Sequence, residues 1–214
     1  MRLQSLKSFS FKGLASAAAL VLLAAAPAAA TNLNLTIQSG GQGTVTVPPG
    51  ANVPYNVVGV LSDAASDGLS GFSLDLTFTG GPLAMANEPS TAPMTSFDKP
   101  AGLTNPAGFG GTVVAGKLVQ VGGAQNTIAN VFAPYPNGNV VVDVAQLGQA
   151  VTLVTGQLTA PVTPGTYTLS MSAVGATVIQ QGSTGVPFWK VEKALPGTLS
   201  PLTVIVSPAP RPRK

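Results

Sequence analysis

Apolar and polar residues alternate along much of the chain with a repeat of two. The stretch 72–78, FSLDLTF, places an apolar residue at every second position. Because successive side chains of a strand leave the backbone on opposite faces, this period indicates a strand with one buried and one polar face. Similar runs recur between clusters of Gly, Pro, Asn and Ser, which is typical of consecutive strands. The candidate strands are Leu33–Ile37, Thr44–Val47, Val53–Leu61, Phe72–Phe78, Lys117–Val121, Ile128–Phe132, Val140–Val144, Val151–Thr159, Tyr167–Ala173, Val174–Ile179, Val186–Val191 and Leu202–Val206.

No segment combines a sustained period of 3.6 residues with helix-capping residues. The chain contains 25 Gly and 19 Pro, which suit many tight turns better than long helices. The sequence therefore predicts an all-β protein, in which about nine to ten strands form two packed antiparallel sheets.

The first thirty residues have the features of an export signal. Arg2, Lys7 and Lys12 form a basic lead, an apolar run follows from Leu14 to Ala26, and Ala28–Ala30 supplies small residues for cleavage. The apolar run is too short to span a bilayer. We expect residues 1–30 to be a signal peptide cleaved after Ala30. No Cys follows the run, so a lipid-anchored form is not expected.

The rest of the chain is predicted to be one β-sandwich domain, residues 31–206. Within it, the stretch 84–111 lacks alternation and is dense in Pro, Ala and Gly, so we expect a long loop that binds something or moves. Residues 207–214, SPAPRPRK, are predicted to be a disordered, Pro-rich basic tail.

Composition excludes several classes of function. The chain has 10 Lys plus Arg and 7 Asp plus Glu, and the signal removes three of the basic residues and none of the acidic ones. The mature chain is thus neutral, with no basic stripe for nucleic acid. It has no Cys and no His, which excludes a thiolate nucleophile, a Ser-His-Asp triad and a His/Cys zinc site.

Two parts of the chain resemble a known family. TVTVPPGANVPYNVVGVLSDAASDGLSGFSLDLTFTGGPL (44–83) is similar to the first half of a cohesin-type domain, and VTLVTGQLTAPVTPGTYTLSMSAVGATVI (151–179) is similar to its closing hairpin. The resemblance implies the jelly-roll sandwich shared with carbohydrate-binding modules, and in cohesins one sheet face binds a calcium-bearing dockerin domain. Phe78-Thr79-Gly80 stands where that family has Tyr-Asp-Pro, so no partner-contact residue is transferred to this chain.

The acidic residues do not form a convincing site. Asp63, Asp67 and Asp75 lack the close regular spacing of a calcium loop. The chain outside the predicted signal has seven carboxylates and no histidine. Because so few ionisable groups are available, we do not expect acid–base catalysis by a pair of carboxylates. We therefore expect no catalytic residue, no metal ligand and no cofactor.

Aromatic residues are the candidates for ligand contact. Tyr135 lies between two prolines in APYPNGN, and Trp189 adjoins Phe188 in VPFWKVE. Tyr135 and Trp189 would contact a ligand if the protein binds sugar rings, and the alternative for each is core packing or a lone exposed ring. Tyr55 and Tyr167 lie on apolar faces and are expected in the core.

Together these observations predict an exported, non-enzymatic binding or structural module that recognises another protein at the cell surface or in the periplasm, with a bacterial type of signal. The alternative is a carbohydrate-binding module that recognises a polysaccharide. We expect no nucleic-acid partner and no membrane span after signal cleavage.

Overall fold

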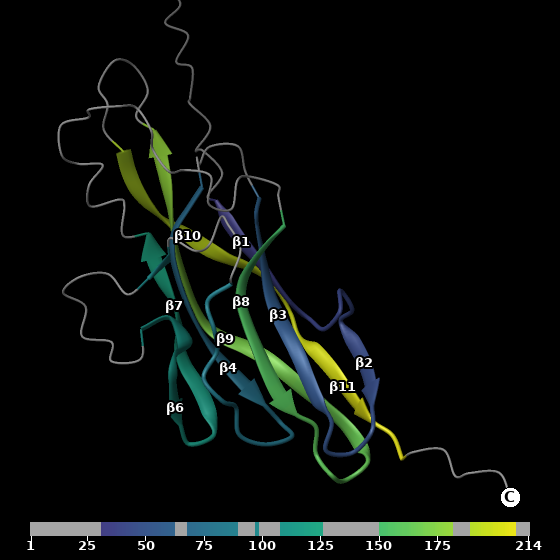
Figure 1. Ribbon diagram of the computed structural model, residues 1–214. Helices are drawn as coiled ribbons and strands as arrows, with labels where there is room; N and C mark the ends of the chain where they lie inside the picture. The colour runs from purple at the N-terminus through teal and green to yellow at the C-terminus, as the bar shows by residue number, and fades with distance from the viewer. Residues whose placement is uncertain are drawn as a thin grey trace, which may run out of the picture.

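The computed structural model describes residues 31–62, 68–89, 97–98, 108–125, 150–181 and 189–208 (Figure 1). In these residues the regular structure is β-strand, apart from one 3₁₀ turn, η2 (Gly108–Gly110), so the predicted all-β class is confirmed. No helix in these ranges is long and apolar enough to cross a membrane. The strands are β1 (Asn32–Gln38), β2 (Thr44–Val47), β3 (Asn52–Leu61), β4 (Gly68–Phe78), β5 (Phe97–Asp98), β6 (Thr112–Val114), β7 (Lys117–Gln125), β8 (Val151–Thr159), β9 (Gly165–Gln181), β10 (Trp189–Ser200) and β11 (Leu202–Val206).

The strands form two layers that share one strand (Figure 1). In the first, called the β4 sheet, β5, β7, β4 and β9 lie in that order, β6 pairs with β7, and β11 and β2 continue beyond β9. The second, called the β1 sheet, contains β1, β3 and β8. Strand β10 pairs with β9 through its first half and with β1 through its second half. The change of partner falls between Ala194 and Leu195, just before Pro196.

The chain also passes between the sheets at the turn that joins β1 and β2. Ser39 and Gln42 exchange two backbone hydrogen bonds of 2.9 and 3.0 Å across Gly40 and Gly41. Both glycines have positive φ, 56° and 80°, which a tight turn of this type requires and which glycine adopts without steric cost. Strand β2 then pairs in parallel with β11. The pairs β1–β10 and β2–β11 are parallel, which the sequence did not predict for an otherwise antiparallel sandwich.

The alternating residues of both sheets meet in one core. On β4, Leu74 and Leu76 are fully buried, as the pattern in 72–78 predicts. From the β1 sheet, the ring of Tyr55 is only 1% exposed, which confirms its predicted core position. Tyr167 packs against the core half-buried, and its hydroxyl donates to the Thr163 carbonyl at 2.9 Å. Burial of aliphatic and aromatic side chains, without disulfides, therefore holds the sheets together.

Some strand boundaries differ from the prediction. Strand β9 is continuous over 17 residues, where the sequence predicts two strands that meet at Ala173 and Val174. The break in alternation there is a bulge inside one strand, because β4 continues to pair with β9 on both sides of it. Strand β10 extends beyond the predicted Val186–Val191 to Ser200 because its second half joins β1.

Several predictions fall wholly or partly outside the described residues. These are the export signal, the strands Ile128–Phe132 and Val140–Val144, and the tail beyond Pro208. The predicted loop 84–111 is described only in part. There Asn87 forms an antiparallel bridge with Thr155 at the edge of β8, and the Ala86 amide donates to the Gly110 carbonyl at 2.9 Å. Backbone hydrogen bonds thus join the described part of this loop to β8 and to η2.

Candidate functional site

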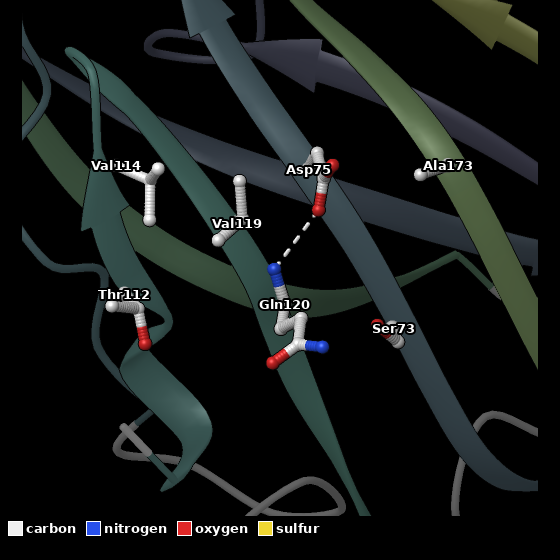
Figure 2. A pocket seen from close by; sticks show the side chains of 7 residues that line it. All are labelled: Ser73, Asp75, Thr112, Val114, Val119, Gln120 and Ala173. Carbon is white, nitrogen blue, oxygen red and sulfur yellow. Dashed lines mark hydrogen bonds between the residues drawn. The ribbon is translucent and has the colours of Figure 1, made fainter. Parts of the chain in front are cut away.

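A shallow hollow of about 540 Å³ lies on the outer face of the β4 sheet, over β6, β7, β4 and β9 (Figure 2). The alternation of β4 turns its polar side chains toward this face because Leu74 and Leu76 point into the core. The hollow is lined by Ser73, Asp75, Thr112, Val114, Val119, Gln120 and Ala173.

Both neighbours of β4 bulge at the level of this hollow. On the β7 side, Leu74 pairs with Val121 and Leu76 with Leu118, so Asp75 faces two residues, Val119 and Gln120. On the β9 side, Ser73 pairs with Gly175 and Asp75 with Ser172, so Leu74 faces both Ala173 and Val174. Each arrangement places two residues against one, which defines a β-bulge.

The two bulges hold side-chain-bearing residues in left-handed backbone conformations. Gln120 has a φ of 56° and Ala173 a φ of 50°. This region is unfavourable for residues with a Cβ, and it is normally occupied by glycine. Two such residues on opposite sides of β4, both lining one hollow, concentrate backbone strain at this place.

Asp75 is directly bonded to the β7 bulge. The backbone amide of Gln120 donates to Oδ1 of Asp75 at 2.9 Å (Figure 2). A bulge interrupts the regular ladder of backbone hydrogen bonds, and here a carboxylate serves as an acceptor for the amide of the inserted residue. Hydrogen bonds to an ionised acceptor are stronger than those between neutral groups. The side chain of Asp75 is half-buried, and the hydrogen bond itself lies at the exposed surface.

The lining combines hydrogen-bonding groups with aliphatic ones. Ser73 and Thr112 contribute hydroxyls, Asp75 a carboxylate and Gln120 a carboxamide, while Val114 is 50% exposed. No basic or aromatic residue belongs to this lining. Such groups can form hydrogen bonds and apolar contacts with another molecule. Within the described ranges, no three His, Cys, Asp or Glu residues lie close enough together to hold a metal ion.

The structure describes neither side chain of the two aromatic candidates from the sequence. Tyr135 lies outside the described residues. Trp189 is the first residue of β10, where its backbone pairs with Gln181, and its side chain is not among those described. Of the acidic residues, Asp63 and Asp67 also lie outside the described ranges. The ligand contacts of Tyr135 and Trp189 therefore stay predictions from the sequence.

Sequence reasoning missed Gln120 and Ala173 as site residues. A signal for both was present in the spacing of inward residues. Leu118 and Val121 are buried but three positions apart, and Met171 and Val174, which pack against the core, have the same spacing. Inward-facing residues of a regular strand are two positions apart. A spacing of three leaves one extra residue between them, which indicates a bulge.

No protein-family model matches the chain, and no curated protein matches its sequence. Solved structures with a similar fold include cohesins, the family that the sequence resembles. The chain is similar to the seventh ScaB type I cohesin of Pseudobacteroides cellulosolvens (TM-score 0.48, 12% identity, covering 86% of this chain and 97% of that one). It is also similar to a chain of the cohesin–dockerin complex Coh-OlpA-Doc918 of Clostridium thermocellum, with a TM-score of 0.49 and 12% identity. This match covers 82% of this chain and 99% of that one. A third similar structure is the non-cellulosomal cohesin of Archaeoglobus fulgidus, with a TM-score of 0.45 and 10% identity. This match covers 81% of this chain and 91% of that one.

The three TM-scores are below 0.5 and the identities below 25%. These likenesses therefore assign no partner and no activity to this chain.

Proposed function

We propose that this chain is an exported, non-enzymatic module that binds another protein through the outer face of the β4 sheet, at the hollow over β6, β7, β4 and β9. The observation that carries the proposal is the pair of left-handed residues, Gln120 and Ala173, that flank β4 in the hollow. Such conformations cost on the order of 1–3 kcal/mol each and cluster at functional sites. Bulges are likewise frequent beside binding sites, where they redirect side chains.

The shape and chemistry of the hollow support a protein partner. It is broad and open, and the exposed Val114 of the edge strand β6 lines it together with Val119. Exposed aliphatic side chains beside hydroxyl, carboxylate and amide groups resemble the mixed surface of a protein–protein interface. The sequence resemblance to cohesins implies the same use of a sheet face. The export signal that the sequence predicts at residues 1–30 supports a partner outside the cytoplasm.

The test is a capture experiment with a matched control. The mature chain is immobilised and exposed to the exported protein fraction of the cells that produce it, and the captured protein is purified and titrated calorimetrically. Val114→Arg changes an exposed residue in the hollow, whereas Thr36→Arg changes an exposed residue on the outer face of the β1 sheet. We expect Val114→Arg to weaken binding at least tenfold and Thr36→Arg to leave it within twofold. Capture of no protein, or equal effects of the two variants, would contradict the proposal.

The carbohydrate-binding alternative is tested in parallel. It depends on Tyr135 and Trp189, so affinity electrophoresis on soluble and insoluble polysaccharides should compare the native chain with Tyr135→Ala and Trp189→Ala. Retardation of the native chain that both variants lose would favour this alternative over protein recognition.

A further inference from the structure

We propose that Asp75 is a positioning residue of the recognition face: its carboxylate holds the Gln120 bulge in its left-handed conformation and so shapes the hollow. The role of Asp75 in recognition rests on the proposed function. Its effect on the conformation of the Gln120 bulge is a property of this chain alone. The direct basis is the bond from the Gln120 amide to Asp75 Oδ1, formed across 45 positions of sequence.

The bulge decides which side chains reach the hollow. In a regular strand, Val119 and Gln120 would point to opposite faces. Here Leu118 and Val121 are both completely buried, so the two residues between them share the outer face. Both line the hollow (Figure 2). Without the bulge, a shift of one residue would exchange inward and outward positions along that part of β7.

Asp75 is placed to stabilise this arrangement because it is the residue that faces the bulge. It stands opposite Val119 and Gln120 in the β4–β7 pairing. Its acceptor reaches the amide of the residue whose φ is 56°. No glycine relieves the strain at that position, so a favourable contact at the Gln120 amide helps to maintain it.

A measurement on the free protein tests the inference without a partner. Backbone NMR couplings that report φ, together with amide hydrogen exchange, are recorded for residue 120. We expect Asp75→Asn, which keeps an acceptor oxygen, to retain the positive φ. Asp75→Ala should speed exchange of the Gln120 amide at least tenfold and shift φ toward negative values. Thr77→Ala, at the next outward position of β4, is the control and should change neither. An unchanged φ and exchange rate in Asp75→Ala would overturn the inference.

A double-mutant cycle on affinity separates positioning from direct contact. Glycine at 120 adopts positive φ without help, so Asp75→Ala should then lose its effect. We expect Asp75→Ala to weaken partner binding about tenfold in the native background and less than twofold in a Gln120→Gly background. Equal losses in both backgrounds would mean that Asp75 touches the partner itself. If no partner is captured, the proposed function fails, while the NMR measurement still decides how the hollow is built.

Discussion

At the scale of single residues, Tyr55 is the clearest unfavourable feature of the core. Its side chain is 1% exposed, and its hydroxyl has no hydrogen-bond partner. The ring lies over Gly156, where a Cβ would overlap it. A buried hydroxyl without a partner costs about 1–3 kcal/mol, whereas the ring itself contributes apolar burial.

Removing that hydroxyl should stabilise the protein. We expect Tyr55→Phe to raise the free energy of unfolding by about 1 kcal/mol, measured by urea denaturation. Tyr167→Phe is the matched control, because its hydroxyl donates to Thr163, and its loss should cost about 0.5–1.5 kcal/mol. A loss of stability in Tyr55→Phe would show that the hydroxyl is satisfied in solution.

The same burial makes stability depend on alkaline pH. Desolvation raises the pKa of Tyr55 from 10.0 to about 12. Between these values the unfolded chain releases the phenol proton while the folded chain keeps it, so stability falls as pH rises from 10 to 12. Tyr55 should account for a decrease of about 2–3 kcal/mol in the free energy of unfolding over this pH range. Denaturation at pH 9 and pH 11.5 should show a smaller loss for Tyr55→Phe than for the native chain, and parallel losses would refute this.

Ala173 offers a direct measure of strain in the β9 bulge. It is exposed and has a φ of 50°, so Ala173→Gly removes little contact and relieves the left-handed strain. We expect stabilisation of about 0.5–1 kcal/mol in thermal or chemical denaturation. Ala176→Gly, at a buried position of the same strand without positive φ, should instead destabilise by about 1 kcal/mol. If both changes destabilise, the bulge is not strained.

At the scale of elements, two glycines flank the same residue of β4 and have different tolerances. Ser73 pairs with Gly122 of β7 on one side and with Gly175 of β9 on the other. A Cβ at Gly122 would overlap the Phe72 carbonyl oxygen, and this glycine has a φ of 141°. A Cβ at Gly175 would meet nothing within 4 Å. The approach of β7 to β4 thus requires glycine, while the approach of β9 does not.

The corresponding alanine variants should differ in stability. We expect Gly122→Ala to lower the free energy of unfolding by more than about 3 kcal/mol, because backbone must move to relieve the overlap. Gly175→Ala should change it by less than about 0.5 kcal/mol. Chemical denaturation of both, with circular dichroism at 25 °C, measures the difference. Similar values for the two would contradict the described register.

At the scale of the whole molecule, the shared strand and common core should make the two sheets unfold together. Strand β10 pairs with β9 and with β1, and buried residues of both sheets form one cluster. Leu74→Ala, at a fully buried position of β4, should cost about 2–5 kcal/mol. Native-state hydrogen exchange should show this loss equally at protected amides of β4 and of β3. Unchanged protection in β3 would mean that the sheets unfold as separate units.

Much of the fold follows from local pattern, because the direction of side chains along a strand is a local property. The run 72–78 predicts the inward face of β4, and the alternation around Tyr55 predicts its burial. The runs Thr44–Val47, Val151–Thr159 and Leu202–Val206 coincide with β2, β8 and β11. The export signal and the single-domain organisation remain predictions from the sequence.

By itself, then, the sequence determined that the chain forms strands, which of their faces are apolar, and that no Cys or His chemistry is available. The tertiary structure alone decided that β10 changes partners before Pro196, that β1 and β10 run parallel, and that Asp75 meets the amide of Gln120. These features depend on which strands pair and in what register. Register is set by how all inward side chains fill one core at once, and alternation within a single segment carries no information about its partner.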